Sequence, residues 1–138
     1  MIAVFLCFVP FTSNAKTNDS KYYYKIKYVT TKEYLGKFKI THYCSCRRCC
    51  GGYSKTASGT NPKAKRTIAV DPRVIKLGSK VKIGKITYTA EDTGGAIKGR
   101  KIDIFCKTHT EALLKGVKYK KVYLIKKKKV RIKCKRKG

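Results

Sequence analysis

The stretch YTAEDTGGAIKGRKIDIF, residues 88–105, decides how the rest of the chain is interpreted. The whole sequence has 7 acidic residues against 35 lysines and arginines, yet three of the seven, Glu91, Asp92 and Asp103, fall in this stretch. Two segments rich in β-type residues flank a Gly-Gly dipeptide. The stretch therefore predicts two short strands that present carboxylates on either side of a glycine-containing loop.

Asp103 lies inside the predicted strand KIDIF, residues 101–105, between Ile102 and Ile104. Successive side chains of a strand point to opposite faces, so the two isoleucines share one face and Asp103 occupies the other. If the isoleucines fill the interior of the fold, Asp103 faces a groove. A position in the middle of a strand is unusual for an aspartate that merely caps a turn.

Asp92 and Asp71 also lie at or near the ends of predicted strands. Asp92 follows ITYTA, residues 86–90, and Asp71 follows TIAV, residues 67–70, directly before a proline. Strand ends and loops are where binding and catalytic sites are built on rigid scaffolds. The alternative is that these aspartates cap turns and pair with lysines, and for Asp71 it stays fully open. Paired carboxylates suit acid–base cleavage of a glycosidic bond, although metal-binding carboxylates look the same at this level.

The remaining chain alternates short strands with turn signals. Residues 44–66 have no apolar period and are rich in Gly, Ser and Thr, which indicates a long functional loop. One turn of helix is expected at residues 72–78 and one clear helix at 108–116. The predicted strands cover residues 21–30, 36–43, 67–70, 80–83, 86–90, 101–105, 121–125 and 130–134. This pattern predicts a mainly β fold, a small barrel or sandwich with a helix across it.

The chain is strongly basic, with a net charge of +28 over 138 residues. Such a charge favours anionic partners: nucleic acid, an acidic membrane surface or an anionic cell-wall polymer. The alternative is that lysine is simply the default surface residue. The basic tail at residues 126–138 resembles a solvated edge strand with a charged end, and no nucleic-acid-binding motif of defined spacing accompanies it.

The first residues have the features of an export signal. Residues 2–11 form an apolar run about as long as the hydrophobic region of a signal peptide, too short to span a bilayer, and small residues precede Lys16. No Lys or Arg precedes the run, which departs from the usual pattern. We predict a signal peptide at residues 1–15, a linker and N-terminal strand at 16–35, and a secreted domain at 36–138.

Seven cysteines are many for this length, and Cys7 would leave with the signal peptide. The cluster at residues 44–50 has the spacing C-x-C-x2-C-C, which is too tight to supply four zinc ligands comfortably from one loop. In an exported chain disulfides are favoured, within the cluster or to more distant cysteines; metal binding or a nucleophilic thiol remain alternatives. His42 adjoins the cluster, whereas His109 and Glu111 fit a capped helix start. The cysteines that would remain are Cys44, Cys46, Cys49, Cys50, Cys106 and Cys134.

Taken together, the residues TASGTNPKAKRTIAVDPRVIKLGSKVKIG, YTAEDTGGAIKGRKIDIF and THTEALLKGV closely resemble the 3D domain, a family named for its three aspartates. The family is related to the C-terminal part of membrane-bound lytic transglycosylase A and to bacterial stationary-phase muralytic proteins. The resemblance covers roughly residues 36–125, and DTGGAIKG followed by Asp is its most specific part. The high lysine content and Ser45, where many members have proline, depart from the usual pattern.

The resemblance implies a double-psi β-barrel with one or two short helices. It also implies lytic cleavage of peptidoglycan between N-acetylmuramic acid and N-acetylglucosamine, which leaves a 1,6-anhydro sugar, without a cofactor or metal. It assigns the acid/base to Asp103, with Asp92 and Asp71 as its neighbours. The expected substrate-binding residues are Thr56, Ser58, Gly59, Thr60, Thr93, Gly94, Gly95 and Lys98, of which the hydroxyls at 56, 58 and 60 could equally belong to an ordinary loop.

Two other functions stay open. A non-catalytic wall-binding module would not need a carboxylate that can be protonated at Asp103. A basic nucleic-acid binder is disfavoured by the export signal and by the lack of a recognition helix. The expected partners are peptidoglycan glycan strands and, through the basic surface, anionic wall polymers. The protein is expected to act as a monomer in the bacterial cell wall, encoded by a bacterium or a phage.

Overall fold

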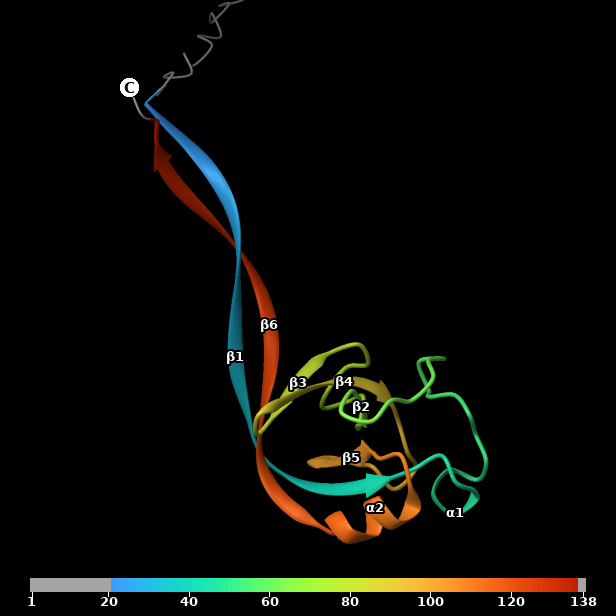
Figure 1. Ribbon diagram of the computed structural model, residues 1–138. Coiled ribbons are helices and arrows are strands. Elements are labelled where there is room, and N and C mark those ends of the chain that lie inside the picture. Colours follow the sequence, from blue (N-terminus) through green and yellow to red (C-terminus); the bar gives the residue numbers. More distant parts are fainter. Residues whose placement is uncertain (1–20, 137–138) are drawn as a thin grey trace, which may run out of the picture. The chain divides into compact units, whose positions relative to one another are not determined.

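A computed structural model of the chain describes residues 21–136 (Figure 1). The predicted mainly β fold is confirmed, and of the one or two short helices expected the structure has two, one of them within the predicted loop at residues 44–66. The predicted signal peptide lies outside the described residues, and among these no helix is long and apolar enough to cross a membrane. In chain order the elements are β1 (Tyr22–Tyr43), α1 (Arg47–Cys50), β2 (Thr67–Ala69), β3 (Lys80–Ile83), β4 (Ile86–Asp92), β5 (Lys101–Phe105), α2 (His109–Lys115) and β6 (Lys118–Lys135).

The described chain divides into two units, and β1 and β6 contribute to both. In the smaller unit, residues 21–27 lie beside residues 130–136. The backbone N–H of Arg136 donates to the carbonyl of Lys21 at 3.0 Å, and the Lys133 ammonium lies 4.1 Å from the centre of the Tyr22 ring. The larger unit, residues 28–129, contains the other strands and both helices.

The strands close into a ring in the order β1-β5-β2-β4-β3-β6. Two pairings, β1 with β5 and β2 with β4, are parallel, whereas β2–β5, β3–β4 and β3–β6 are antiparallel. Parallel neighbours need long crossover connections, so segments far apart in the sequence meet side by side. Closing the ring leaves few unpaired strand edges.

The core follows the side-chain alternation of β1 and β5. Phe38 and Ile40 of β1 are buried on the same side of the sheet as Ile102 of β5. The residue that follows Ile40 and the residue that follows Ile102 face the other way: Thr41 of β1 lies in register with Asp103 of β5. The buried core consists of Phe38, Ile40, Ile68, Val70, Ile75, Val81, Ile83, Tyr88, Ala90, Ile102, Ile104 and Val122.

Five predicted elements differ from the structure: four strands that merge into two, and one helical turn. The strands expected at 21–30 and 36–43 are one continuous strand, β1, with Gly36 in the left-handed region at φ 114°. Likewise, the strands expected at 121–125 and 130–134, with most of the basic tail, form β6.

The expected turn of helix at residues 72–78 is a series of turns. The Asp71 carbonyl accepts the backbone N–H groups of Val74 and Ile75, both at 2.9 Å. The chain then leaves this turn because the N–H of Gly78 donates to the carbonyl of Ala90 in β4 at 2.7 Å. Pairing with β4 therefore replaces continuation as a helix.

Candidate active site

A cleft of about 650 Å³ opens on the larger unit and contains two of the three aspartates, Asp92 and Asp103. Asp71 is not among the described residues that line it. The cleft combines carboxylates, aromatic rings and small residues, as expected of a site that binds a polar ligand. Its lining consists of Tyr43, Cys49, Cys50, Tyr53, Lys55, Thr56, Ala57, Pro62, Ala69, Asp92, Thr93, Gly94, Gly95, Ile97 and Asp103.

Strand β2 brings the two carboxylates to one site. Ala69 pairs with Asp92 of β4 on one side and with Asp103 of β5 on the other. Neighbouring strands lie about 4.8 Å apart, so the two aspartate backbones are separated by roughly 10 Å with only an alanine between them. The small side chain of Ala69 leaves open space between the two carboxylates, and it lines the cleft itself.

Asp103 is half-buried, and one protein donor contacts it. Its Oδ1 accepts a hydrogen bond from Thr41 Oγ1 at 2.9 Å, and within the described part of the chain no protein donor bonds to Oδ2. Burial raises the pKa of Asp103 above its ordinary value, and the charge of Asp92 adds to the increase. The hydrogen bond from Thr41 and the charge of Lys101 act in the opposite direction. The result is a carboxyl group that favours its protonated form more than a surface aspartate does.

Asp92 has a different environment, with three donors among the described residues. Tyr43 donates its hydroxyl to Oδ2 at 2.8 Å, while the backbone N–H groups of Ala57 and Thr93 both donate to Oδ1 at 2.9 Å. These bonds fix the orientation of the carboxylate. Burial, with the bond to Asp92, raises the pKa of Tyr43, so the phenol remains a donor at neutral pH.

Asp71 is buried and holds a turn together. Arg73 donates Nε to Oδ1 at 3.0 Å and Nη2 to Oδ2 at 2.8 Å, and its backbone N–H also donates to Oδ1. The N–H of Gly99 donates to Oδ2 at 2.8 Å and so connects this turn to the loop that precedes β5. These bonds, led by those from Arg73, hold the pKa of Asp71 well below its usual range. In this structure Asp71 therefore organises two loops and does not meet Asp103 in the cleft.

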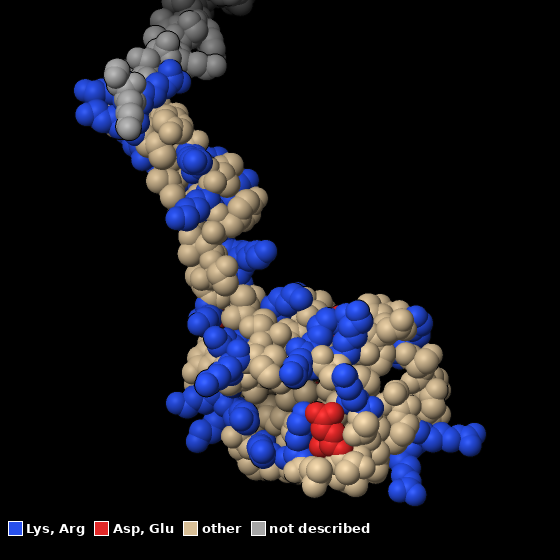
Figure 2. Space-filling view, viewed as in Figure 1, with Lys and Arg blue, Asp and Glu red and all other residues tan. Residues whose placement is uncertain are grey.

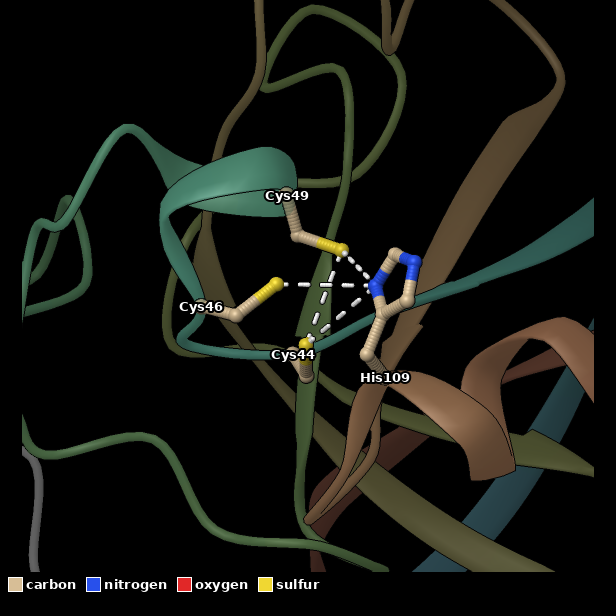
Figure 3. A group of neighbouring side chains, drawn as sticks. All are labelled: Cys44, Cys46, Cys49 and His109. Carbon is tan, nitrogen blue, oxygen red and sulfur yellow. Dashed lines mark hydrogen bonds between the residues drawn. The ribbon is translucent and has the colours of Figure 1, made fainter.

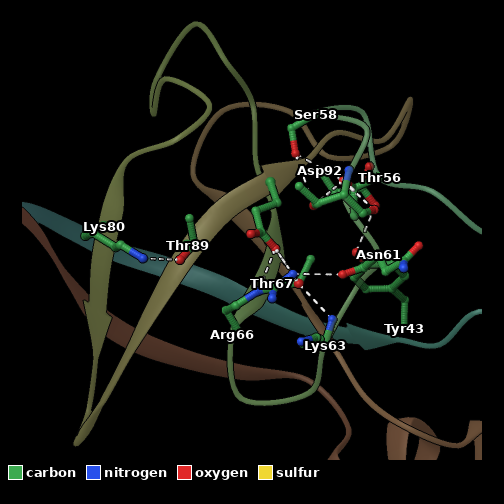
Figure 4. A network of polar contacts seen from close by, with 12 residues as sticks. Tyr43, Thr56, Ser58, Asn61, Lys63, Arg66, Thr67, Lys80, Thr89 and Asp92 are labelled. Carbon is green, nitrogen blue, oxygen red and sulfur yellow. Dashed lines mark hydrogen bonds and ion pairs between the residues drawn. The ribbon is translucent and has the colours of Figure 1, made fainter.

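The predicted hydroxyl residues form a compact turn at one side of the cleft (Figure 4). Thr56 is buried, and its hydroxyl lies 2.9 Å from that of Thr60 and 3.1 Å from that of Ser58. Gly59 supplies the positive φ of 79° that this turn requires. Thr56 lines the cleft, whereas Ser58, Gly59 and Thr60 do not. Their hydroxyls bond mainly to one another, which gives them a structural role in the turn.

The loop after β4 contributes Thr93, Gly94 and Gly95 to the cleft, while Lys98 is exposed outside its lining. A side chain at position 94 would collide with Ile97, because a Cβ there would lie 2.9 Å from Ile97 Cγ1. A Cβ on Gly95 would meet no atom within 4 Å. Packing therefore requires glycine at position 94, and open space in front of Gly95 leaves room for a ligand.

Two residues that the sequence did not single out, Thr41 and Tyr43, donate to the two carboxylates. A signal for both was present: the two residues alternate along β1 with the buried Ile40 and so share the face opposite the core. Their partners could not be identified, because Asp103 lies 62 residues from Thr41 in the parallel neighbour β5 and Asp92 lies 49 residues from Tyr43 in β4.

The predicted disulfides are not supported by the structure. All six described cysteines are free thiols, and the sulfurs of Cys44 and Cys49, which contact each other, are 3.6 Å apart. His42 does not join the cysteine cluster either, since its Nδ1 lies 3.1 Å from the carbonyl of Gly116. His109, expected only as part of a capped helix start, does contact the cluster: its Nδ1 lies 3.4 Å from Cys49 Sγ.

Comparison with known proteins connects these features to a family. The family model named 3D domain matches residues 66–126, which include all three aspartates. The cell wall-binding protein YocH of Bacillus subtilis (strain 168) is 55% identical over 74 residues, 49% of this chain and 25% of YocH. YabE of the same organism, whose name describes cell wall shaping, is 38% identical over 120 residues, 83% of this chain and 28% of YabE.

The chain spans about a quarter of the length of these two relatives. Among solved structures, MltA from Escherichia coli, described as having a unique lytic transglycosylase fold, is 25% identical, with a TM-score of 0.48 over 54% of this chain and 28% of MltA. Residues 66–126 of this chain are thus similar to the 3D domain family.

Proposed function

We propose that the protein is a peptidoglycan lytic transglycosylase that uses Asp103 as its acid/base. One observation carries the proposal: a half-buried carboxyl group lines a cleft large enough for sugar units, has a raised pKa, and receives no hydrogen bond at Oδ2 from residues 21–136. A general acid needs a pKa close to the working pH, and burial is the usual means of raising that of an aspartate. The parallel pairings β1–β5 and β2–β4 agree with the proposed double-psi form of the ring.

In the proposed reaction Asp103 first donates its proton to the glycosidic oxygen. The bond from C1 of N-acetylmuramic acid breaks, and N-acetylglucosamine leaves with a new hydroxyl. The resulting Asp103 carboxylate then takes the proton from the C6 hydroxyl of muramic acid, whose oxygen bonds to C1 and closes the 1,6-anhydro ring. Asp103 returns to its starting state, so a single residue serves both steps and no water is consumed.

Asp92 is proposed to position and tune this acid. Its orientation is fixed by Tyr43, Ala57 and Thr93, and its charge contributes to the raised pKa of Asp103. The exposed face of Gly95 and the backbone of Thr93 would form part of the sugar-binding surface. We assign Asp71 to the support of this loop region.

The proposed partner is the glycan of the cell wall, where we also propose that the protein acts. The names of YocH and YabE refer to cell wall binding and shaping, which supports this assignment. Figure 2 shows lysine and arginine side chains distributed over the visible face, with few acidic atoms among them. Such a surface would hold the protein near anionic wall polymers through long-range attraction that salt weakens.

The products of wall digestion test the proposal. Purified protein is incubated with peptidoglycan, and the released fragments are analysed by mass spectrometry. We expect fragments with 1,6-anhydromuramic ends, which lack one water relative to the products of hydrolysis. If all released fragments have reducing ends, the protein hydrolyses the glycosidic bond and the proposed lytic mechanism is wrong.

A second candidate is a module that binds the wall without cleaving it, favoured by the name of YocH and by the net charge of +28. It predicts that the protein sediments with peptidoglycan, releases no fragments over a broad range of pH and salt, and binds equally well after Asp103→Asn. Release of anhydro fragments by wild-type protein excludes it.

Replacing Thr41 with valine should move the pH dependence of lysis. The Thr41 hydroxyl lowers the pKa of Asp103 by bonding to Oδ1, so its removal raises that pKa further. Since the first step needs protonated Asp103, the fall in kcat/KM at high pH should shift to higher pH. Thr31→Val is the matched control, because the Thr31 hydroxyl contacts the Lys126 carbonyl, away from Asp103. A shift in the opposite direction, or an equal shift in both variants, would contradict the assignment.

A further inference from the structure

Three cysteines and one histidine converge beside the cleft (Figure 3). The ligand atoms of Cys44, Cys46, Cys49 and His109 all lie within 4.8 Å of one another. His109 Nδ1 is 3.9 Å from Cys44 Sγ, 3.5 Å from Cys46 Sγ and 3.4 Å from Cys49 Sγ, and the sulfurs of Cys44 and Cys49 are 3.6 Å apart. In Figure 3 the four side chains point toward a common centre.

We propose that this group binds a structural zinc ion. Four ligands in a tetrahedron around zinc, with Zn–S about 2.3 Å and Zn–N about 2.05 Å, place sulfurs about 3.8 Å apart and sulfur and nitrogen about 3.6 Å apart. The Cys44–Cys49 distance of 3.6 Å and the three sulfur–nitrogen distances of 3.4, 3.5 and 3.9 Å lie close to these values, and the other two sulfur–sulfur distances are within 4.8 Å. Thiolate and imidazole ligands in a tetrahedral arrangement select zinc over the hard cations, and three cysteines with one histidine are a common set.

The geometry does not fit the disulfides that an exported chain would favour. A disulfide holds its sulfurs about 2.05 Å apart, well short of the 3.6 Å between Cys44 and Cys49. Forming it would use two of the three thiols that face the histidine. The four groups are instead spaced as ligands of one central ion.

Local structure explains how a tight cysteine cluster can supply this site. Cys46 and Cys49 form the usual C-x2-C pair around α1, and the N–H of Cys49 donates to the Cys46 carbonyl at 3.1 Å. Gly51, at φ 63°, ends the helix in the left-handed conformation. The fourth ligand comes from another element: His109 is the first residue of α2, whose N-cap Thr108 accepts from the N–H of Glu111.

A metal bound by this group would connect the segment at residues 44–49, which includes the start of α1, to α2. Cys49 lines the cleft, and so does Cys50, whose thiol donates to the Cys44 carbonyl at 2.7 Å. Cys50 also packs on the cluster that contains Tyr43 and Ile97. All four positions around the ion are taken by protein, which is typical of structural rather than catalytic zinc. The ion would therefore maintain this wall of the cleft without taking part in cleavage.

The test is the metal content of the full-length chain, purified without chelators from a reducing cytoplasm. We expect about one zinc per chain by elemental analysis. His109→Ala and Cys49→Ser should each retain little metal after dialysis. The matched controls His42→Ala and Cys134→Ser, which change the same residue types outside the group, should retain all of it. A metal-free wild-type protein, or zinc retained equally by all four variants, would overturn the proposal.

Two further measurements do not depend on the folding of a variant that loses the metal. Replacing the zinc of wild-type protein with cobalt should produce the thiolate-to-metal charge-transfer and visible bands of a tetrahedral site. His109→Cys, which supplies a fourth thiolate, should restore the metal lost in His109→Ala. An octahedral cobalt spectrum, or a Cys44–Cys49 disulfide found in the metal-free chain as purified, would contradict the zinc site. These results are independent of the proposed lytic activity, since none of them measures lysis.

Discussion

Asp103→Asn should lower the rate of wall lysis by about 10²–10⁴, the usual contribution of a general acid–base residue. Asparagine keeps the shape of the side chain and its contact with Thr41 but cannot give a proton to the glycosidic oxygen. The measurement is the initial rate of anhydro-fragment release as a function of pH. A folded Asp103→Asn protein with nearly wild-type activity would contradict the assignment, and Asp92 would become the better candidate.

The same substitution should not weaken the fold. Burial raises the pKa of Asp103 and so favours the protonated carboxyl group in the folded protein. The stability that this carboxyl group contributes is fully present below the pKa that an aspartate has in the unfolded chain, about 3.9, and is lost as the pH rises through the pKa of folded Asp103. The amide of the Asp103→Asn variant carries no charge at any pH and avoids this loss, so thermal unfolding at neutral pH should occur at or above the wild-type temperature. Circular dichroism checks this.

Asp92→Asn should lower the rate of lysis less than Asp103→Asn does. It should also move the pH optimum downward, because the charge of Asp92 is one source of the raised pKa of Asp103.

Asp71→Asn should have its main effect on stability. The buried carboxylate accepts two hydrogen bonds from the Arg73 side chain and one each from the backbone N–H groups of Arg73 and Gly99. An amide cannot accept all of them and leaves the guanidinium without its counter-charge. We expect the melting temperature to fall by at least several degrees.

The pH dependence of this effect has a definite sign. Since the pKa of Asp71 is held well below its usual range, its stabilisation is present above the unfolded pKa, near pH 4, and is lost as pH falls toward the folded pKa. The difference between wild type and Asp71→Asn should therefore shrink in acid. Glu33→Gln is the control, because the ion pair of Glu33 with Lys126 is exposed and should contribute little. Equal melting temperatures for wild type and Asp71→Asn would show that the turn does not depend on the charge.

The sequence allowed much of the β structure and the position of Asp103 to be predicted. The alternation of side chains in KIDIF was sufficient to predict the orientation of Asp103, because strand periodicity is a local property. In the structure Ile102 and Ile104 are buried and Asp103 lines the cleft. Strand continuity was not predictable, since the polar residues of the long paired strands β1 and β6 resemble linkers. Their regularity comes from pairing with distant strands.

The grouping of the site residues could not be predicted either. Asp71 and Asp92 both follow predicted strands in the sequence, yet Arg73, two residues away, binds Asp71, and the pairing of Ala69 brings Asp92 and Asp103 together. The fourth ligand of the cysteine cluster could not be identified from the sequence for a similar reason. His109 lies 60 residues beyond Cys49 and fits a helix start, so nothing local connects it to the thiols.

The parallel pairing of β1 with β5 has a consequence for how the protein folds. It joins Thr41 to Asp103, 62 residues apart, and closing such a loop costs entropy before any favourable contact forms. Proteins dominated by such contacts fold slowly, on the millisecond to second scale. The same pairing brings together the proposed acid and its hydrogen-bond donor, and the proposed metal ligands follow β1 and β5 on its two sides. Chains that end before β5 lack Asp103, so the proposed lytic activity could arise only after β5 has been synthesised and has paired with β1.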